Sequence, residues 1–159
     1  MKHLALILSI SLLLATYANA APVVFIVRHA EKASNGGNPD LSVEGQKRAD
    51  ALAQILKDSK ITSVFVTEFK RTQETAAPTA RAAQVSPTVV PASDIGALVQ
   101  KLRALNGNAL VVGHGNTIPD LLRALGIATT VSIPEDDYTE IFAVLVGDAP
   151  QLVRLHYPF

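Results

Sequence analysis

The sequence predicts an α/β domain in which a mostly parallel central sheet lies between helices as a three-layer sandwich. Four short apolar runs are typical of strands buried on both faces, and they cover residues 23–27, 64–66, 109–112 and 141–146. Segments with helical periodicity separate these runs, and this alternation favours right-handed crossovers and a parallel sheet covered on both sides. We therefore expect all four runs to be central parallel strands. A further short strand is expected through Val89 and Val90.

The helices are predicted from apolar stripes. The first stripe follows Ser42 and the second follows Asp94, which are both good N-cap residues, and a third begins near Thr117. Another helix follows Arg71, and Pro78 inside it removes one backbone donor, so we expect a kink or an end there. The stripes consist of Ala49, Leu52, Ala53 and Leu56, then Leu98, Leu102 and Leu105, then Leu121, Leu122 and Leu125.

The composition excludes several classes of protein. A chain of 159 residues has room for one globular domain, and its 14 Lys+Arg balance its 14 Asp+Glu. No basic surface is therefore expected, and nucleic acid is not an expected partner. The absence of cysteine excludes disulfides, thiolate nucleophiles and cysteine-bound metals. With 48% hydrophobic residues, stability must come from an apolar core.

Residues 1–20 have the pattern of a secretory signal peptide. Met1 and Lys2 give a positive start, residues 4–18 carry no charge, and Ala18-Asn19-Ala20 is a small-x-small cleavage pattern. A membrane anchor is the alternative, but a span needs about 20 apolar residues, which is more than this run offers. We expect cleavage after Ala20, no stable membrane anchor afterwards, and a periplasmic or secreted domain over residues 21–159.

Unusual polar residues follow three of the predicted strands. The strand at 23–27 is followed by Arg28-His29-Ala30-Glu31, and the strand at 64–66 is followed by residues 67–71, which end in Arg71. The strand at 109–112 is followed closely by His114-Gly115-Asn116. Ligands of open α/β sheets bind beyond the carboxyl ends of the strands. A single histidine or arginine at a strand end is usually structural. Two of each at one sheet edge predict a functional site.

The chemistry that these four residues favour is phosphoryl transfer. Two guanidinium groups offer forked donors to phosphate oxygens, one imidazole can attack phosphorus, and the second can stabilise an equatorial oxygen. Neither a metal nor another cofactor is then required. Gly115 permits close backbone approach, and we expect the helix near Thr117 to direct its first amides toward a bound anion.

These residues resemble the histidine phosphatase superfamily, the phosphoglycerate mutase-like group, in its branch of small one-domain phosphatases. Ala30 stands where the family usually has Gly, and Thr67 where it usually has Ser, and both changes are small. Asn116 stands at a position that varies in the family. Four motifs similar to those of the family occur in the same order: Arg28-His29-Ala30-Glu31, Leu41-Ser42-Val43-Glu44-Gly45, the stretch 67–76 with Arg71, and Val112-Gly113-His114-Gly115.

The resemblance implies a role for each matching residue. His29 attacks phosphorus to form a phosphohistidine, while Arg28, Arg71 and His114 hold the phosphoryl oxygens. The two arginines are expected to keep His29 neutral. Asn35 stands six residues beyond His29, where the family often has Asn, and it is expected to add a donor. Glu31 either orients the site or pairs with a neighbouring basic group.

The general acid of the resembled branch follows the strand after the Arg71 helix. Asp94 is the first carboxylate reached there, and it has an alternative role as an N-cap. Glu135, Asp136 and Asp137, in the loop before the fifth strand, are the other candidates.

The segment 77–93 leaves no room for the lid that the sugar-phosphate mutases of the family carry. An open site favours a phosphatase over a mutase, which must shield its intermediate from water. We expect the partner to be a phosphorylated small molecule or an envelope sugar phosphate, with a phosphohistidine protein as another substrate.

Two other functions stay open. One is a non-catalytic phosphate-ligand binding module, and the other is a metal site of His29, His114 and Glu31 or Asp94, which Arg28 and Arg71 disfavour.

Overall fold

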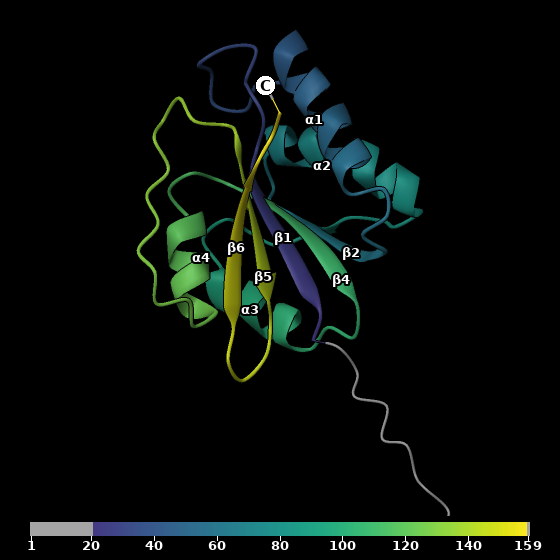
Figure 1. The fold of residues 1–159 in the computed structure, drawn as a ribbon. Helices are drawn as coiled ribbons and strands as arrows, with labels where there is room; N and C mark the ends of the chain where they lie inside the picture. Colours follow the sequence, from purple (N-terminus) through teal and green to yellow (C-terminus); the bar gives the residue numbers. More distant parts are fainter. Residues whose placement is uncertain (1–20, 159) are drawn as a thin grey trace, which may run out of the picture.

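The computed structural model describes residues 21–158, in which six strands form one sheet in the order β3-β2-β4-β1-β5-β6 (Figure 1). The predicted signal peptide lies outside the described residues. The elements in chain order are β1 (Val23–Arg28), α1 (Val43–Ile55), β2 (Ile61–Val66), α2 (Lys70–Ala83), β3 (Thr88–Val89), α3 (Ile95–Arg103), β4 (Asn108–Gly113), α4 (Ile118–Ala124), β5 (Glu140–Leu145) and β6 (Gln151–His156).

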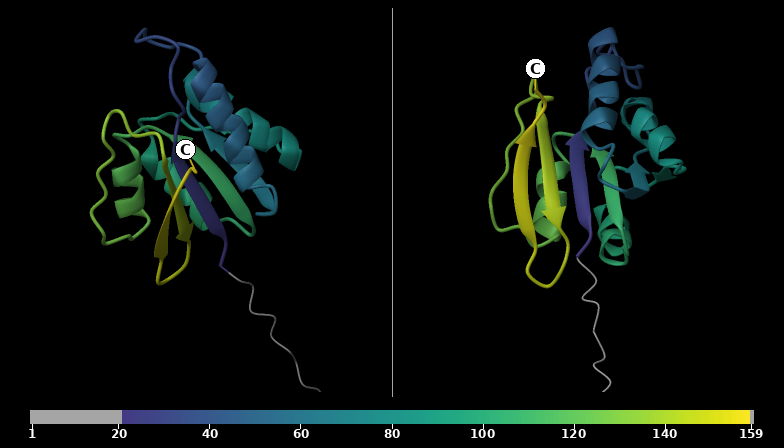
Figure 2. Two further views of the ribbon diagram at one scale, coloured as in Figure 1. Left: turned by 45° about the horizontal axis from the view of Figure 1, so that its top comes forward. Right: turned by 45° about the vertical axis from the view of Figure 1, so that its right-hand side comes forward.

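The sheet is covered on both faces, which confirms the predicted three-layer α/β class. Helices α1 and α2 lie on one side of the sheet, and α3 and α4 lie on the other (Figures 1 and 2). Successive side chains of a strand point to opposite faces. On β1, Val24 and Ile26 accordingly pack in the core beneath α3 and α4, while Val27 packs in the core beneath α1 and α2.

The carboxyl ends of four parallel strands lie at one edge of the sheet. Strands β1, β2, β3 and β4 are parallel, and Arg28 at the end of β1 lies opposite Gly113 at the end of β4. The loops that follow β1 and precede β5 lie at this same end of the molecule (Figure 1). The sheet therefore brings together segments that are far apart in sequence.

Two expectations about the strands need correction. The run 141–146 was expected to be a central parallel strand, but β5 pairs antiparallel with β1. Strand β6, which pairs antiparallel with β5, was not predicted. Its side chains are mostly exposed, so it lacks the apolar run by which buried strands are detected.

The helices agree with the predicted stripes. Ser42 caps α1 by accepting a hydrogen bond from the Gly45 N–H, at 3.0 Å. Pro78 does not end its helix, because α2 continues to Ala83. In the part of the chain that the structure describes, no helix is long and apolar enough to cross a membrane.

Candidate active site

The two predicted histidines meet at the carboxyl ends of β1 and β4. The backbone N–H of His29 donates to the Gly113 carbonyl at 2.9 Å, which extends the parallel pairing by one residue. The ring centroids of His29 and His114 are 5.4 Å apart. The side chains are almost completely buried, with 5% exposure for His29 and 7% for His114. The register of two neighbouring strands thus places both imidazoles together.

An open pocket of about 370 Å³ lies at this edge of the sheet. Its size suits a small ligand. All four residues predicted to handle a phosphoryl group line it, together with residues that follow His114 and residues from the loop before β5. The lining consists of Arg28, His29, Arg71, His114, Gly115, Asn116, Ile133 and Glu135.

The ring of His29 is held in one tautomer. Its Nδ1 lies 2.8 Å from the Ala30 carbonyl oxygen, which can only accept, so Nδ1 carries the proton. In a neutral ring the lone pair is then on Nε2. The pKa of His29 is lowered to about 4, and the largest cause is burial. The hydrogen bond to Ala30 raises this pKa, whereas His114, Arg71 and Arg28 lower it. The imidazole is therefore neutral at pH 7, with burial contributing more than the arginines.

A chain of hydroxyl groups holds His114. Its Nε2 lies 3.0 Å from Oγ1 of Thr67, which lies 3.0 Å from Oγ1 of Thr72. The Thr72 hydroxyl donates to the Phe69 carbonyl at 2.8 Å. Because that carbonyl accepts, the chain is consistent when His114 Nε2–H donates to Thr67 and Thr67 donates to Thr72. Nδ1 of His114 is then the unprotonated nitrogen.

Arg71 lies beside this second histidine. Its Nη2 is 3.5 Å from Nδ1 of His114, and its guanidinium carbon lies 4.3 Å from the ring centroid of Phe69. Burial lowers the pKa of His114 to about 4, the positive charges of Arg71 and Arg28 lower it further, and Glu68 raises it. His114 is neutral in the free protein and would gain a proton more easily beside a bound anion.

Arg28 links the pocket to the loop before β5. Its Nη1 donates to the carbonyls of Pro134 at 3.0 Å and Asp137 at 2.9 Å. Its guanidinium carbon lies 4.1 Å from the ring centroid of Tyr138. The Nη1 group is thereby occupied, Nη2 donates to the Tyr138 hydroxyl at 3.5 Å, and Nε has no hydrogen-bond partner within residues 21–158.

The donor set fits an anion. Nε of Arg28 and Nε of Arg71 are both buried, and neither has a hydrogen-bond partner within residues 21–158. A buried donor without a partner costs free energy, on the order of 1–3 kcal/mol. Phosphoryl oxygens would satisfy both donors, because guanidinium groups bind phosphate through forked pairs of N–H groups.

The backbone at the start of α4 differs from the expectation. The N–H groups of Thr117 and Ile118 both donate to the His114 carbonyl at 3.0 Å. These first amides of α4 are therefore not directed toward an anion, as the sequence reasoning expected. Gly115 and Asn116 form that wall of the pocket instead.

Several predicted residues lie outside the pocket lining, and among them are Asp136 and Asp137, two of the alternative candidates for the general acid. Asn35 is exposed in the loop after β1. Asp94 caps α3, since its Oδ1 accepts from the Ala97 N–H at 2.9 Å, and it lines a separate apolar cavity of about 30 Å³. Glu31 is bound by Arg48 through Nε and Nη2, which supports the pairing role. A Cβ on Gly45 would clash with the Glu31 carbonyl oxygen, so α1 packs closely there.

Sequence reasoning missed the contacts of three residues. Thr67 was noted only for replacing Ser, Glu68 was given no role, and Tyr138 was not considered. Glu68 accepts a hydrogen bond from the Ala92 N–H at 2.9 Å and is a negative charge near His114. The position of Thr67 and Glu68 after β2 was a signal that could have found them. No group of three His, Asp or Glu in the described part of the chain could hold a metal ion.

Comparisons with known proteins agree with this geometry. Residues 24–93 match the model of the histidine phosphatase superfamily (branch 1). A search of curated proteins found no match. The fold is similar to that of the protein histidine phosphatase SixA complexed with tungstate, with 23% identity over 84% of this chain and 96% of that chain and a TM-score of 0.72. It is also similar to mycobacterial glucosyl-3-phosphoglycerate phosphatase Rv2419c, with 11% identity over 86% and 98% and a TM-score of 0.68.

The fold and the pocket define an α/β protein with two neutral imidazoles and two arginines at the carboxyl edge of its sheet. Residues 24–93 are similar to the histidine phosphatase superfamily (branch 1), and the described chain shares the fold of the histidine phosphatase SixA.

Proposed function

We propose that this protein is an exported phosphatase that hydrolyses phosphomonoesters through a phosphohistidine on His29. The observation that carries the proposal is the hydrogen bond of His29 Nδ1 to the Ala30 carbonyl, which leaves the lone pair on Nε2 in a pocket with two arginines. A neutral imidazole held in this tautomer is a ready nucleophile. The export part of the proposal is supported by the signal-like pattern of residues 1–20.

The reaction has two steps. Nε2 of His29 attacks phosphorus, the bond between phosphorus and the ester oxygen breaks, and the leaving oxygen takes a proton. A water molecule then attacks phosphorus, the bond to Nε2 breaks, and inorganic phosphate leaves. Arg28, Arg71 and His114 would hold the equatorial oxygens, where negative charge is spread in the transition state. We propose that neither step needs a metal ion, which an assay with EDTA tests.

Asp94 is the proposed proton donor to the leaving oxygen, and the structure places it at the α3 N-cap rather than in the pocket lining. The proposal requires that Asp94→Asn slow esters of poorly acidic alcohols far more than aryl esters, whose oxygen needs little protonation. An unchanged ratio would leave Asp94 as a helix cap. The role would then pass to Glu135, the alternative that lines the pocket.

Envelope sugar phosphates and other small phosphomonoesters are the proposed substrates. A phosphohistidine protein is the second candidate, favoured by the fold shared with the protein histidine phosphatase SixA. A non-catalytic module that binds phosphate ligands is the third. The unpaired Nε groups of Arg28 and Arg71 are compatible with all three.

The test is to trap the intermediate. Mature protein is incubated briefly with a labelled aryl phosphate and denatured in base, in which phosphohistidine is stable. Label should appear on His29, and His29→Ala should abolish both label and turnover. His156→Ala is the matched control, because His156 is on β6 and outside the pocket lining, and this variant should keep both. Tungstate binding without label or turnover in the unmodified protein would favour the binding module.

A further inference from the structure

The pocket combines a positively charged floor with a negatively charged rim. Arg28 and Arg71 lie on the floor beside the two histidines. Glu135 is the acidic residue among the lining residues within 21–158, and it is exposed. The arginines and histidines of the floor are sufficient to bind a phosphoryl group. Glu135 is therefore available to interact with the rest of the substrate.

Glu135 is held in place by a turn. The Asp137 N–H donates to the Pro134 carbonyl at 3.1 Å, which closes a turn with Glu135 and Asp136 at its centre. Nη1 of Arg28 donates to the carbonyls at both ends of this turn. The same arginine that lines the pocket therefore holds the backbone of this turn, and the backbone position of Glu135 relative to the two arginines is built into the fold.

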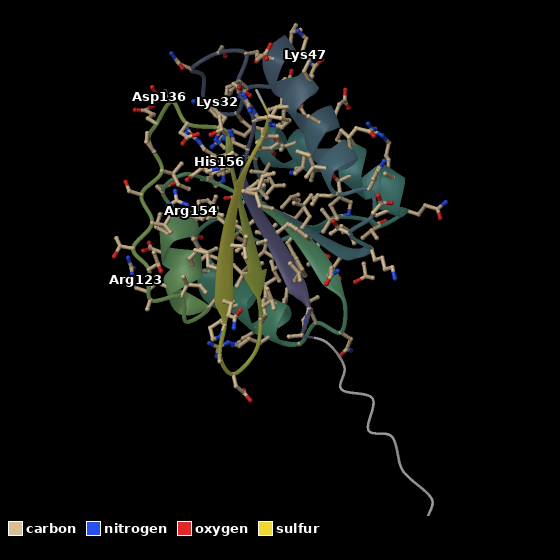
Figure 3. All side chains as sticks on the ribbon, viewed as in Figure 1. Lys32, Lys47, Arg123, Asp136, Arg154 and His156 are labelled. Atoms are coloured by element: carbon tan, nitrogen blue, oxygen red, sulfur yellow. The ribbon has the colours of Figure 1, made fainter. Side chains whose placement is uncertain are left out.

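The three neighbouring carboxylates have different surroundings. Asp137 Oδ1 accepts from the N–H and the hydroxyl of Thr139, both at 2.7 Å. Its hydrogen bonds therefore stabilise the loop itself. Asp136 lies at the outer edge of the loop (Figure 3). Lys32 lies at the same end of the molecule as Asp136 but not in the pocket lining. Glu135 is thus the carboxylate of this turn that reaches the pocket.

We infer that the site selects phosphomonoesters whose leaving group carries a positive charge, such as an ammonium group a few bonds from the ester oxygen. This inference rests on the proposed phosphatase function. In an in-line attack the leaving oxygen points away from His29 and out of the floor. A cation on the leaving group can then pair with Glu135, whereas an anionic group meets repulsion. Exposed pairs of this kind are weak, so the selectivity is a few-fold.

The experiment compares three phenyl phosphates of similar shape and leaving-group acidity. Their para substituents are aminoethyl, propyl and carboxyethyl, which differ in charge. The kcat/KM of mature wild-type protein should be highest for the cation and lowest for the anion, with about 3-fold to 5-fold between neighbours. Glu135→Gln should bring the three values close together, and Glu135→Lys should reverse the order. Asp136→Asn is the matched control, because it removes a charge of the same turn outside the pocket, and the order should persist.

The outcomes separate the inference from the proposed function. Failure of the wild-type protein to hydrolyse any of the three esters would overturn the phosphatase proposal. Hydrolysis with equal kcat/KM for all three would overturn the charge selectivity alone. A proton-donor role for Glu135 would make Glu135→Gln slow all three esters by the same factor. The ratio between them would then stay as in wild type, which also contradicts the inference.

Discussion

At the scale of single residues, His114 is held by neutral hydroxyl groups rather than by a carboxylate. The partner of its Nε2 is Thr67, and the chain continues through Thr72 to a backbone carbonyl. A carboxylate in this place would stabilise the imidazolium form. The hydroxyl chain fixes the ring without favouring its charge, so the proton state of His114 can respond to the substrate.

Thr67→Val should lower kcat/KM by about 10-fold or more, since removing a residue that orients a functional group has effects of this size. The reason is that valine keeps the shape of threonine but cannot accept from Nε2–H of His114. Thr67→Ser should restore most of the activity. The ¹⁵N chemical shifts of His114 report the tautomer directly, and they should change in Thr67→Val and not in Thr67→Ser.

Thr79→Val is the matched control for Thr67→Val. Thr79 is also a buried threonine, and its hydroxyl has no partner within the described residues. The control should keep wild-type kcat/KM. A Thr67→Val variant with the same activity as this control would contradict the positioning role.

At the scale of elements, α3 depends on its cap. Asp94 satisfies the N–H of Ala97, one of the amides at the helix start that have no partner within the helix. The helix has nine residues and packs Leu102 into the core, so fraying of its first turn would reach the apolar cavity beneath it. The cap is thus part of the wall of this cavity.

Asp94→Ala should lower the free energy of unfolding by about 1 kcal/mol, the usual cost of losing an N-cap side chain. Asp94→Asn should lower it by much less, because asparagine caps as well as aspartate does. Urea unfolding of both variants checks this. Equal losses in the two variants would mean that the charge of Asp94, rather than its capping oxygen, stabilises α3.

The sequence could predict those elements whose burial in the core produces a pattern of apolar residues. The strands β1, β2 and β4 are buried on both faces and appear in the sequence as apolar runs. Locating these strands also located the polar residues at their ends. The direction of β5 could not be predicted, because an apolar run is the same in either direction. The edge strand β6 has no such run, and the course of α2 past Pro78 depends on packing against α1 and the sheet.

The candidate site was predictable for the same reason. His29 and His114 follow strands whose register is set by the sheet, so their meeting required no knowledge of loops. Tyr138 contacts Arg28, and the turn that contains Glu135 is held through carbonyls that accept from Arg28, whose side chain could have bound many other groups. Loop contacts of this kind leave no periodic signal in the sequence.

At the scale of the whole molecule, the buried histidines couple folding to pH. Each has its pKa lowered from 6.5 to about 4 in the folded protein. The unfolded chain therefore binds more protons between these values, and stability is full above about pH 6.5 and falls as the pH falls toward 4. Glu31, Asp40, Glu68 and Asp137 also have lowered pKa values, but their contribution is lost only at lower pH.

Lowering the pH from 6.5 to 4.5 should therefore reduce the free energy of unfolding, on the order of 4 kcal/mol for the two histidines together. Urea unfolding at a series of pH values measures this. The double variant His29→Gln, His114→Gln should show a much smaller change over the same interval. An equal slope in this variant would assign the dependence to other groups. Phosphate or tungstate should flatten the wild-type slope, because an anion stabilises the charged form of His114.

The position of β1 between β4 and β5 also governs when the protein can become active during its synthesis. Strand β1 ends in Arg28, is followed directly by His29 and is translated before the other strands, yet Val24 pairs with Ala109 and Val23 pairs with Leu145. A nascent chain that ends after α4 contains both arginines and both histidines of the site. It lacks β5, which pairs with one side of β1, and the turn whose carbonyls accept hydrogen bonds from Arg28. The proposed phosphohistidine on His29 should therefore form only after the final strands have been translated.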